Sequence, residues 1–316
     1  MRRLMGSRTV RWGFVAVTVG LGAWAIISRW SGPHGVQASL SELGSAAVLG
    51  ALICVLAGLL ALMQIYRVLL AALGSPLPAR TAAQILFVGQ LGKYLPGSVW
   101  PVLAQMELGA AHQVPRRRSA SASVLTMLMS LLAGILVGLV MIPFSKGAAP
   151  YRWVFWFAPV VLICLYPRVL NQILDRLLRL ARRPPLEQPL TGRAIGTALA
   201  WGLVSWILLG LQIWLLAARM GLSGPSGVLL AIGAFAFAWC AGFLVVLAPA
   251  GAGVREFVLI ALLGPALGGG AVGGTKALAV ALVSRVLMTL GDLLSAGTAA
   301  WFARRSRSVP AARHSA

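Results

Sequence analysis

Apolar stretches of about 20 residues recur along the whole sequence, and they constrain the fold more than any other feature. Because an α-helix rises about 1.5 Å per residue, each stretch is long enough to cross a hydrocarbon layer about 30 Å thick. Only 10% of the 316 residues are charged and 59% are hydrophobic, whereas about a quarter of a soluble domain is charged. A water-soluble fold of this length would have to expose many of these apolar side chains. We therefore expect an all-α, polytopic transmembrane bundle.

Six of the stretches are continuous enough to predict full membrane spans. They lie at residues 11–28, 44–66, 119–142, 153–167, 194–218 and 275–302. The first has a basic start, but Ser28, Arg29 and Trp30 make a poor small-residue cleavage site, so we expect this span to be retained. The prediction is a single membrane domain over residues 1–302, followed by a basic tail over residues 303–316.

The basic residues gather between the apolar stretches. There are 27 of them against six acidic residues, a formal charge of +21 that would suggest nucleic-acid binding in a soluble chain. No platform of aromatic and basic residues accompanies the clusters, which argues against that function. Instead, the basic segments follow the positive-inside rule, which predicts that they and both chain termini face the cytoplasm. These segments are the N-terminus and residues 67–80, 116–118, 168–193 and 304–313.

Two further apolar regions, residues 82–112 and 226–264, are interrupted by proline and glycine. For both flanks of the first region to be cytoplasmic, it must enter the membrane and return to the same face. By the same reasoning, the second region must enter and return from the outer face. Each would be a re-entrant hairpin or a pair of short helices, and two opposed broken segments indicate an inverted repeat with a substrate site near the midplane. The alternative is two ordinary spans joined by loops.

Residues 168–183 have one apolar face and one basic face. This pattern predicts a short helix lying on the inner leaflet, ended by Pro184 and Pro185, within a basic interfacial segment that extends to residue 193. The alternative is a solvated linker.

Six charged side chains lie in or against the apolar segments, where an unpaired charge costs about 2.5 to 3.5 kcal/mol on insertion scales. They are Lys93, Glu107, Arg255, Glu256, Arg285 and Asp292. Three are positive and three are negative, so the set can be neutral overall. Arg285 and Asp292 are seven residues apart and share one helix face. We expect Asp292 to meet Arg255 or Lys93, and Arg285 to meet Glu256 or Glu107.

The first interrupted region contains the motif GQLGKYLPGSVWP. Its glycines allow close helix approach, Pro96 and Gly97 break the helix, and Ser98 can cap the half-helix that follows. The free N–H groups of that half-helix would face an anionic group, with Lys93 beside them. In the alternative interpretation, Tyr94 marks the headgroup level and Lys93 only snorkels to the interface.

The second interrupted region contains the motif LAPAGAGVRE, in which a glycine-rich turn at Gly251 and Gly253 precedes a charged helix start. Glu256 suits the positive end of that helix, whereas Arg255 opposes the helix dipole and needs a partner or an anionic ligand. Adjacent side chains on a helix point about 100° apart, so we do not expect these two to pair with each other. One of them should face the substrate cavity, and the alternative is a purely structural ion pair to another span.

At these residues the chain resembles a known family, the flippase-like transmembrane region of bacterial lysylphosphatidylglycerol synthases (the multiple peptide resistance factor) and its stand-alone homologues. The resemblance rests on the motifs GKYLPGSVW and PAGAGVRE in this order, and it covers essentially the whole chain. It implies a bacterial cytoplasmic membrane protein that moves a phospholipid, or another lipid with an anionic or aminoacylated head, between leaflets. The soluble aminoacyl-transfer domain of the synthases is not expected, so lipid synthesis is not expected either.

The expected function is therefore lipid translocation without chemical conversion. The candidate substrate-binding residues are Lys93, Tyr94, Pro96, Gly97, Ser98, Glu107, Gly251, Gly253, Arg255, Glu256, Arg285 and Asp292. No cofactor or metal is expected, because the three cysteines and three histidines are scattered. One rival is a membrane-embedded lipid transferase, which would need paired acids such as DxD or a large polar loop. The other is a non-transporting scaffold of an envelope-assembly complex, and partners other than lipids, including a second copy of the chain, are left open.

Overall fold

The computed structural model describes residues 36–94, 99–145, 149–180, 185–244 and 253–307. These residues form helices and connecting turns, and none of them forms a strand. The predicted all-α class is thereby confirmed. The expected division into a membrane domain and a basic tail stays a prediction.

Five of the described helices are long and apolar enough to cross a membrane. They are α3 (Ser45–Ala72), α6 (Arg116–Met141, extended by η3, Ile142–Phe144), α9 (Gly192–Ala218), α10 (Gly224–Leu244) and α12 (Gly270–Arg307). Four of them confirm the spans predicted at residues 44–66, 119–142, 194–218 and 275–302. The chain is thus a multi-pass membrane protein. The span predicted at residues 11–28 lies outside the described residues, which begin with the short helix α2 (Val36–Ser41).

The span predicted at residues 153–167 is built in two parts. A 3-10 stretch, η4 (Ala149–Phe157), leads into helix α7 (Ala158–Leu165), and the chain then bends by 76° into α8 (Pro167–Leu180). A 3-10 helix rises about 2.0 Å per residue and an α-helix about 1.5 Å, so η4 and α7 together reach about 30 Å, the thickness of the hydrocarbon layer. Counted as one span, the bent pair gives six candidate spans.

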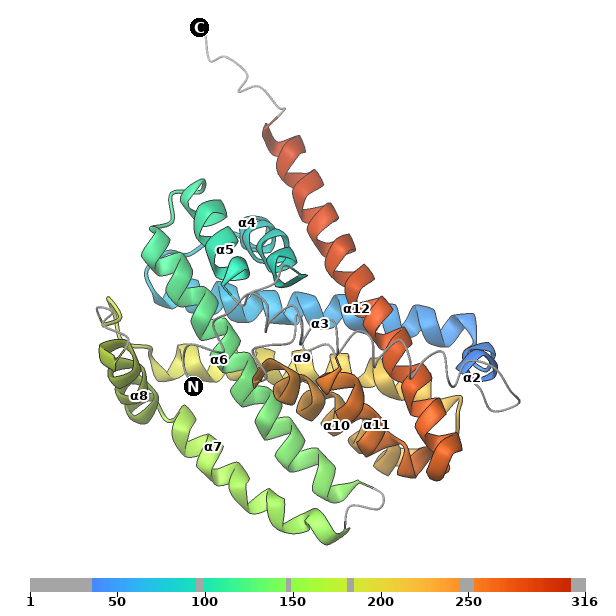
Figure 1. Ribbon diagram of the computed structural model, residues 1–316. Coiled ribbons are helices and arrows are strands. Elements are labelled where there is room, and N and C mark those ends of the chain that lie inside the picture. The colour runs from blue at the N-terminus through green and yellow to red at the C-terminus, as the bar shows by residue number, and fades with distance from the viewer. Residues whose placement is uncertain (1–35, 95–98, 146–148, 181–184, 245–252, 308–316) are drawn as a thin grey trace, which may run out of the picture.

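Helix α8 confirms that residues 168–180 are helical and amphipathic (Figure 1). Leu170 and Leu174 are buried on one face. The Asn171 side-chain amide donates to Pro167 O at 2.8 Å and to Leu190 O at 2.9 Å, while its oxygen accepts from Leu190 N at 2.9 Å. The helix is therefore fixed to the linker that follows it. Its placement on the inner leaflet stays a prediction.

The first interrupted region folds back on itself. Its first arm consists of α4 (Ala79–Ala83), a π-helical turn η1 (Gln84–Val88) and a 3-10 turn η2 (Leu91–Tyr94), and its second arm is α5 (Trp100–Ala110). A Cβ atom at Gly92 would lie 2.9 Å from Pro101 N and from the carbonyl carbon of Trp100. Only glycine allows the two arms to approach so closely. The predicted helix break itself, at residues 95–98, lies outside the described residues.

The second interrupted region has arms of unequal length. Its first arm, α10, is 21 residues long, whereas α11 (Val254–Leu263) has 10 residues and continues into the 3-10 turn η6 (Pro265–Leu267). Gly233 within α10 is a packing position, because a Cβ there would lie 3.1 Å from Ile142 N. Helix α11 begins after Gly253, whose φ of 85° is in the left-handed region that favours glycine.

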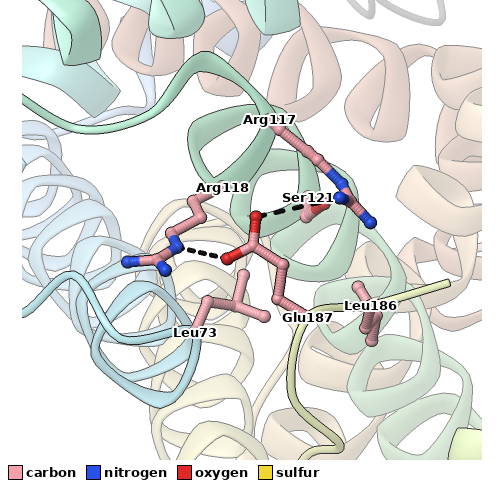
Figure 2. A pocket seen from close by; sticks show the side chains of 6 residues that line it. All are labelled: Leu73, Arg117, Arg118, Ser121, Leu186 and Glu187. Carbon is pink, nitrogen blue, oxygen red and sulfur yellow. Dashed lines mark hydrogen bonds and ion pairs between the residues drawn. The ribbon is translucent and has the colours of Figure 1, made fainter. Parts of the chain in front are cut away.

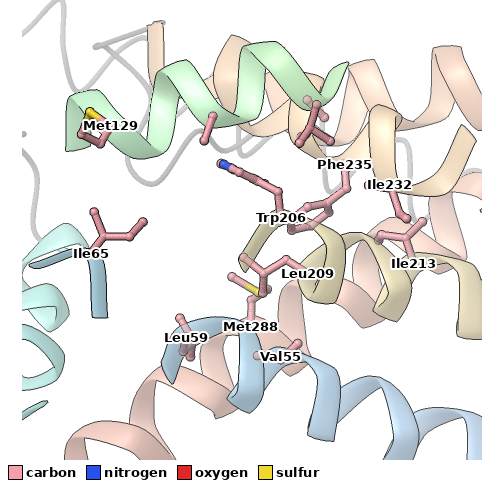
Figure 3. Close-up of a cluster of buried hydrophobic side chains, with 14 of the residues drawn as sticks. Val55, Leu59, Ile65, Met129, Trp206, Leu209, Ile213, Ile232, Phe235 and Met288 are labelled. Carbon is pink, nitrogen blue, oxygen red and sulfur yellow. The ribbon is translucent and has the colours of Figure 1, made fainter. Parts of the chain in front are cut away.

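The hydrophobic core lies where α3, α6, α9, α10 and α12 meet (Figures 1 and 3). Trp206 fills its centre and donates from Nε1 to Ser130 O at 2.8 Å, which satisfies the indole in an apolar environment. A Cβ at Gly134 would lie 2.9 Å from the Trp206 ring, so this glycine provides the space for it. Helix α12 crosses α3 at Gly291, where a Cβ would lie 3.3 Å from Leu59 Cδ1. This close crossing positions the charged face of α12.

Candidate functional site

Helix α12 carries partners for both interrupted regions. From the first region, Lys93 Nζ lies 2.6 Å from Asp292 Oδ2, and the Tyr94 hydroxyl donates to the same oxygen at 2.6 Å. The Asp292 side chain is only 5% exposed, whereas that of Lys93 is 29% exposed. A carboxylate this deeply buried needs both donors, because an unpaired charge in an apolar interior is costly.

From the second region, Glu256 forms an ion pair with Arg285 of α12. The other carboxylate oxygen of Glu256 accepts a hydrogen bond from Gly253 N at 2.7 Å. Glu256 thus satisfies a free N–H group at the start of α11 and neutralises a cation on the neighbouring helix. Among the pairings that the sequence left open, the structure has Lys93 with Asp292 and Glu256 with Arg285.

The Arg255 side chain contacts uncharged side chains. It is buried, with 8% of its surface exposed. Its guanidinium lies over the Phe235 ring at 4.5 Å from the centroid and donates to Ser284 Oγ at 3.4 Å. Ser284 also accepts from Gln212 Nε2 at 2.9 Å, while Gln212 Oε1 is buried without a hydrogen-bond partner among the described residues. All six acidic residues of the chain are described, and none lies within ion-pair distance of Arg255.

Glu107 lies apart from this cluster. Its carboxylate is exposed and accepts two hydrogen bonds from Arg116, at 3.0 and 2.9 Å. Hydrogen bonding to Arg116 lowers the pKa of the Glu107 carboxyl from its ordinary value. The six charges predicted as one balanced set therefore divide. Three cations and two carboxylates gather on α12 and its neighbours, which leaves one excess positive charge, on Arg255.

Four of the candidate residues, Pro96, Gly97, Ser98 and Gly251, lie outside the described residues. In the part that is described, α5 begins at Trp100 with no side-chain cap. Sequence reasoning did not single out Ser284 and Phe235, which contact Arg255, or Gln212, which donates to Ser284. Gln212 did carry a signal, because it is an amide within an apolar span and is fully buried. Ser284 and Phe235 are too common in transmembrane helices to have been recognised.

A second group of charges lies where α6 begins (Figure 2). Arg118 Nε donates to Glu187 Oε2 at 2.6 Å, and Arg118 also donates to Gly74 O at 3.0 Å, while Arg117 lies 3.9 Å from Glu187. The cavity beside them has about 10 Å³, room for about one water molecule. These contacts join α3, α6 and the linker before α9, and their role is structural.

The described residues contain no group of three or more His, Cys, Asp or Glu side chains that could hold a metal ion. Cys54, Cys164 and Cys240 are free thiols on three different helices. The chemistry of the α12 cluster is that of a cationic binding site with balancing carboxylates. It presents a buried guanidinium, a group whose chemistry suits phosphate, together with two ion pairs whose cations are partly exposed, Lys93 at 29% and Arg285 at 36%.

Comparison with known protein families gives a match over most of the sequence. Residues 12–296 match the family model described as the lysylphosphatidylglycerol synthase TM region. No curated protein matches the sequence. The matched range includes both interrupted regions and all five residues of the α12 charge cluster.

Proposed function

We propose that the chain, which belongs to the family of the lysylphosphatidylglycerol synthase transmembrane region, moves a lipid between the two leaflets of a bacterial cytoplasmic membrane. The lipid would be a phospholipid or another lipid with an anionic or aminoacylated head. The chain would act without converting its substrate chemically and without a cofactor. Both termini would face the cytoplasm, as the positive-inside rule predicts.

The observation that carries this proposal is the excess positive charge on Arg255. Arg255 is buried and has no carboxylate partner, although the other two cations of the cluster have one each. A single charge near the membrane centre costs about 2.5 to 3.5 kcal/mol on insertion scales, so it is retained where it has a function. A lipid phosphate would supply the missing negative charge and accept hydrogen bonds from the guanidinium.

The two ion pairs would open so that their charged groups can bind the lipid head. Lys93 and Arg285 are partly exposed, so each can turn towards a phosphate. When Arg285 turns, the Glu256 carboxylate would be free to accept the ammonium group of an aminoacylated head. The arrangement would thus bind both kinds of lipid while its acyl chains stay in the bilayer.

We place the cluster at the interface between two opposed hairpins, as part of an inverted repeat. The support is that α12 contacts one charged residue from the end of η2 and one from the start of α11, at positions seven residues apart on the same face. Irregular backbone near the midplane is tolerated where protein or a polar cavity satisfies it, which is where transporters bind their substrates. The sequence has no nucleotide-binding motif, so transport would be downhill or coupled to an ion.

A leaflet-specific lipid assay on reconstituted vesicles tests the proposal. Wild-type protein should speed the movement of labelled phosphatidylglycerol across the bilayer relative to protein-free vesicles. Arg255→Gln should slow this movement roughly tenfold or more, because a charged hydrogen bond is worth about 1.5 to 3 kcal/mol. The control is Arg219→Gln, which removes an exposed arginine at the end of α9.

Two results would count against the proposal. Equal rates for Arg255→Gln and wild type would remove Arg255 from the site. The absence of lipid movement by wild-type protein, together with a stoichiometric partner that co-purifies with it, would favour a scaffold.

A further inference from the structure

A separate cavity of about 410 Å³ lies between α6, α7 and α9, away from the α12 cluster. Every residue that lines it is apolar. The lining includes Leu136, Val140, Phe155, Leu162, Leu203 and Ile207. A cavity of this kind offers no hydrogen bond to water, so hydrocarbon suits it better than water does.

The size of the cavity indicates which hydrocarbon it holds. A cavity of about 150 Å³ lined by Leu, Ile and Phe binds one benzene molecule. By proportion, 410 Å³ has room for about 16 carbon atoms, the length of a membrane acyl chain. A transmembrane helix with its side chains is about 10 to 12 Å across, so two turns of it occupy about two to three times this volume. The volume therefore suits one acyl chain better than a helix.

Aromatic residues indicate the depth of the cavity. Trp153, Trp156 and Phe157 of the 3-10 stretch η4 are 60%, 76% and 52% exposed. Tryptophan gathers at the boundary between headgroups and acyl chains, so the exposed tryptophans place the start of η4 near that boundary. Phe155 lies in the same stretch, lines the cavity and packs edge-on against Phe144 at 5.5 Å. The cavity therefore lies in the leaflet opposite the basic start of α6.

We propose that this cavity is a binding site for one acyl chain of a phospholipid in the outer leaflet. The chain would fill the space between α7 and the pair α6 and α9, and so hold the short helix α7 in place. The site uses neither Arg255 nor the ion pairs of α12, and its existence does not depend on lipid translocation.

Photolabelling with a lipid probe tests this site. The full-length protein is reconstituted in vesicles of phosphatidylglycerol and phosphatidylethanolamine that contain a phospholipid with a diazirine midway along one acyl chain. Illumination and peptide mapping should place the label mainly on the cavity-facing parts of α6, α7 and α9. The exposed face of α3 at Leu49 and Ile53, which are 60% and 67% exposed, reports contact with ordinary bilayer lipid.

A matched pair of variants separates the site from general lipid contact. Val140→Phe fills the cavity, whereas Val160→Phe makes the same change on α7 at a residue that is 54% exposed and does not line the cavity. Val140→Phe should lower labelling of α7 and α9 severalfold, because the added ring takes up space that the acyl chain would fill. Val160→Phe should leave labelling unchanged. Uniform labelling of all lipid-facing helices in wild-type protein would overturn the proposal. Equal labelling of the two variants would overturn it as well. If Val140→Phe fails to fold, the labelling map of the wild-type protein decides.

Discussion

The Lys93 ammonium lies 2.6 Å from an Asp292 carboxylate oxygen, and this contact joins the first interrupted region to the last long helix. The two partners are not equivalent, because the Asp292 side chain is 5% exposed and the Lys93 side chain 29%. Lys93 can extend towards a polar phase when its partner is removed. Asp292 cannot, since it is held within the bundle and, among the described residues, has Tyr94 as its one further donor.

We therefore predict unequal effects when the pair is broken from either side. Lys93→Ala should destabilise the protein by about 3 kcal/mol, because it leaves a buried carboxylate without its cation. Asp292→Asn should cost about 1 kcal/mol or less, because Lys93 is partly exposed and Tyr94 can still donate to the amide oxygen. Thermal unfolding of the purified protein in detergent measures both.

The double variant Lys93→Ala with Asp292→Asn provides the check on this reasoning. It should be more stable than Lys93→Ala alone, because no uncompensated charge is left. Arg193→Ala, which removes an exposed arginine near the start of α9, should have no measurable effect. If Asp292→Asn proved more damaging than Lys93→Ala, the difference in exposure would not be what sets the energetics.

Arg255 and Arg285 should respond differently to the same substitution. Arg285→Met leaves Glu256 without its cation, so the variant should unfold at a lower temperature than wild type. Arg255→Met removes a charge worth about 2.5 to 3.5 kcal/mol of insertion cost. It also loses the ring contact with Phe235, worth about 2 kcal/mol at most, and the hydrogen bond to Ser284, worth about 1 kcal/mol. The Arg255→Met protein should therefore be about as stable as wild type although it loses lipid movement. A clear loss of thermal stability in Arg255→Met would indicate a structural role.

The long helices could be predicted from sequence because their signal is local. Four of the six predicted spans became long helices, and α9 begins two residues before its expected start and ends at its expected limit, whereas α3 extends six residues beyond its expected end. The length of α10 was not predicted, because the whole of region 226–264 was expected to form a re-entrant hairpin or a pair of short helices. Gly233 within α10 is a packing position against Ile142, and the sequence alone does not show which neighbour a glycine will meet.

The charged residues of the site were found from sequence, but their pairing was not. The cost of burying a charge marks each residue individually, whereas the choice of partner depends on how distant segments pack. Arg116 shows this clearly, because it is close to Glu107 across a short turn and takes that carboxylate away from the cluster. The excess charge on Arg255 follows from this one contact, so it was visible only in the structure.

Two glycines of α9 should respond oppositely to alanine. A Cβ at Gly210 would collide with Ile232 Cα of α10 and lie 2.9 Å from Ile232 Cβ, so Gly210→Ala should cost about 1 to 3 kcal/mol. A Cβ at Gly196 would meet no atom within 4 Å, so Gly196→Ala should raise stability by about 0.5 to 1 kcal/mol through helix propensity. Thermal unfolding of the two variants side by side measures the difference. Equal effects would mean that α9 and α10 do not pack closely at Gly210.

Helix α8 should lie in the surface of an anionic leaflet. It bends by 76° from the segment before it, which turns it away from the direction of a crossing helix. Leu177 and Leu180 are 53% and 84% exposed next to Arg176 and Arg179, an arrangement that suits acyl chains below and lipid phosphates beside the helix. A cysteine at Leu180 should therefore be protected from a water-soluble maleimide in phosphatidylglycerol vesicles, whereas one at Gln172, on the polar face, should react.

The labelling uses protein in which Cys54, Cys164 and Cys240 are replaced by alanine, in vesicles opened so that both faces are accessible. Replacing the anionic lipid with phosphatidylcholine should increase labelling at position 180, because each arginine near an anionic surface contributes about 1 kcal/mol to its attachment. In 1 M salt the Debye length falls to about 3 Å, so the attraction between the arginines and the anionic vesicles is screened. The difference in labelling at position 180 between anionic and phosphatidylcholine vesicles should therefore be smaller in 1 M salt. Rapid labelling at position 180 in every lipid would show that α8 is a solvated linker, the alternative that its sequence left open.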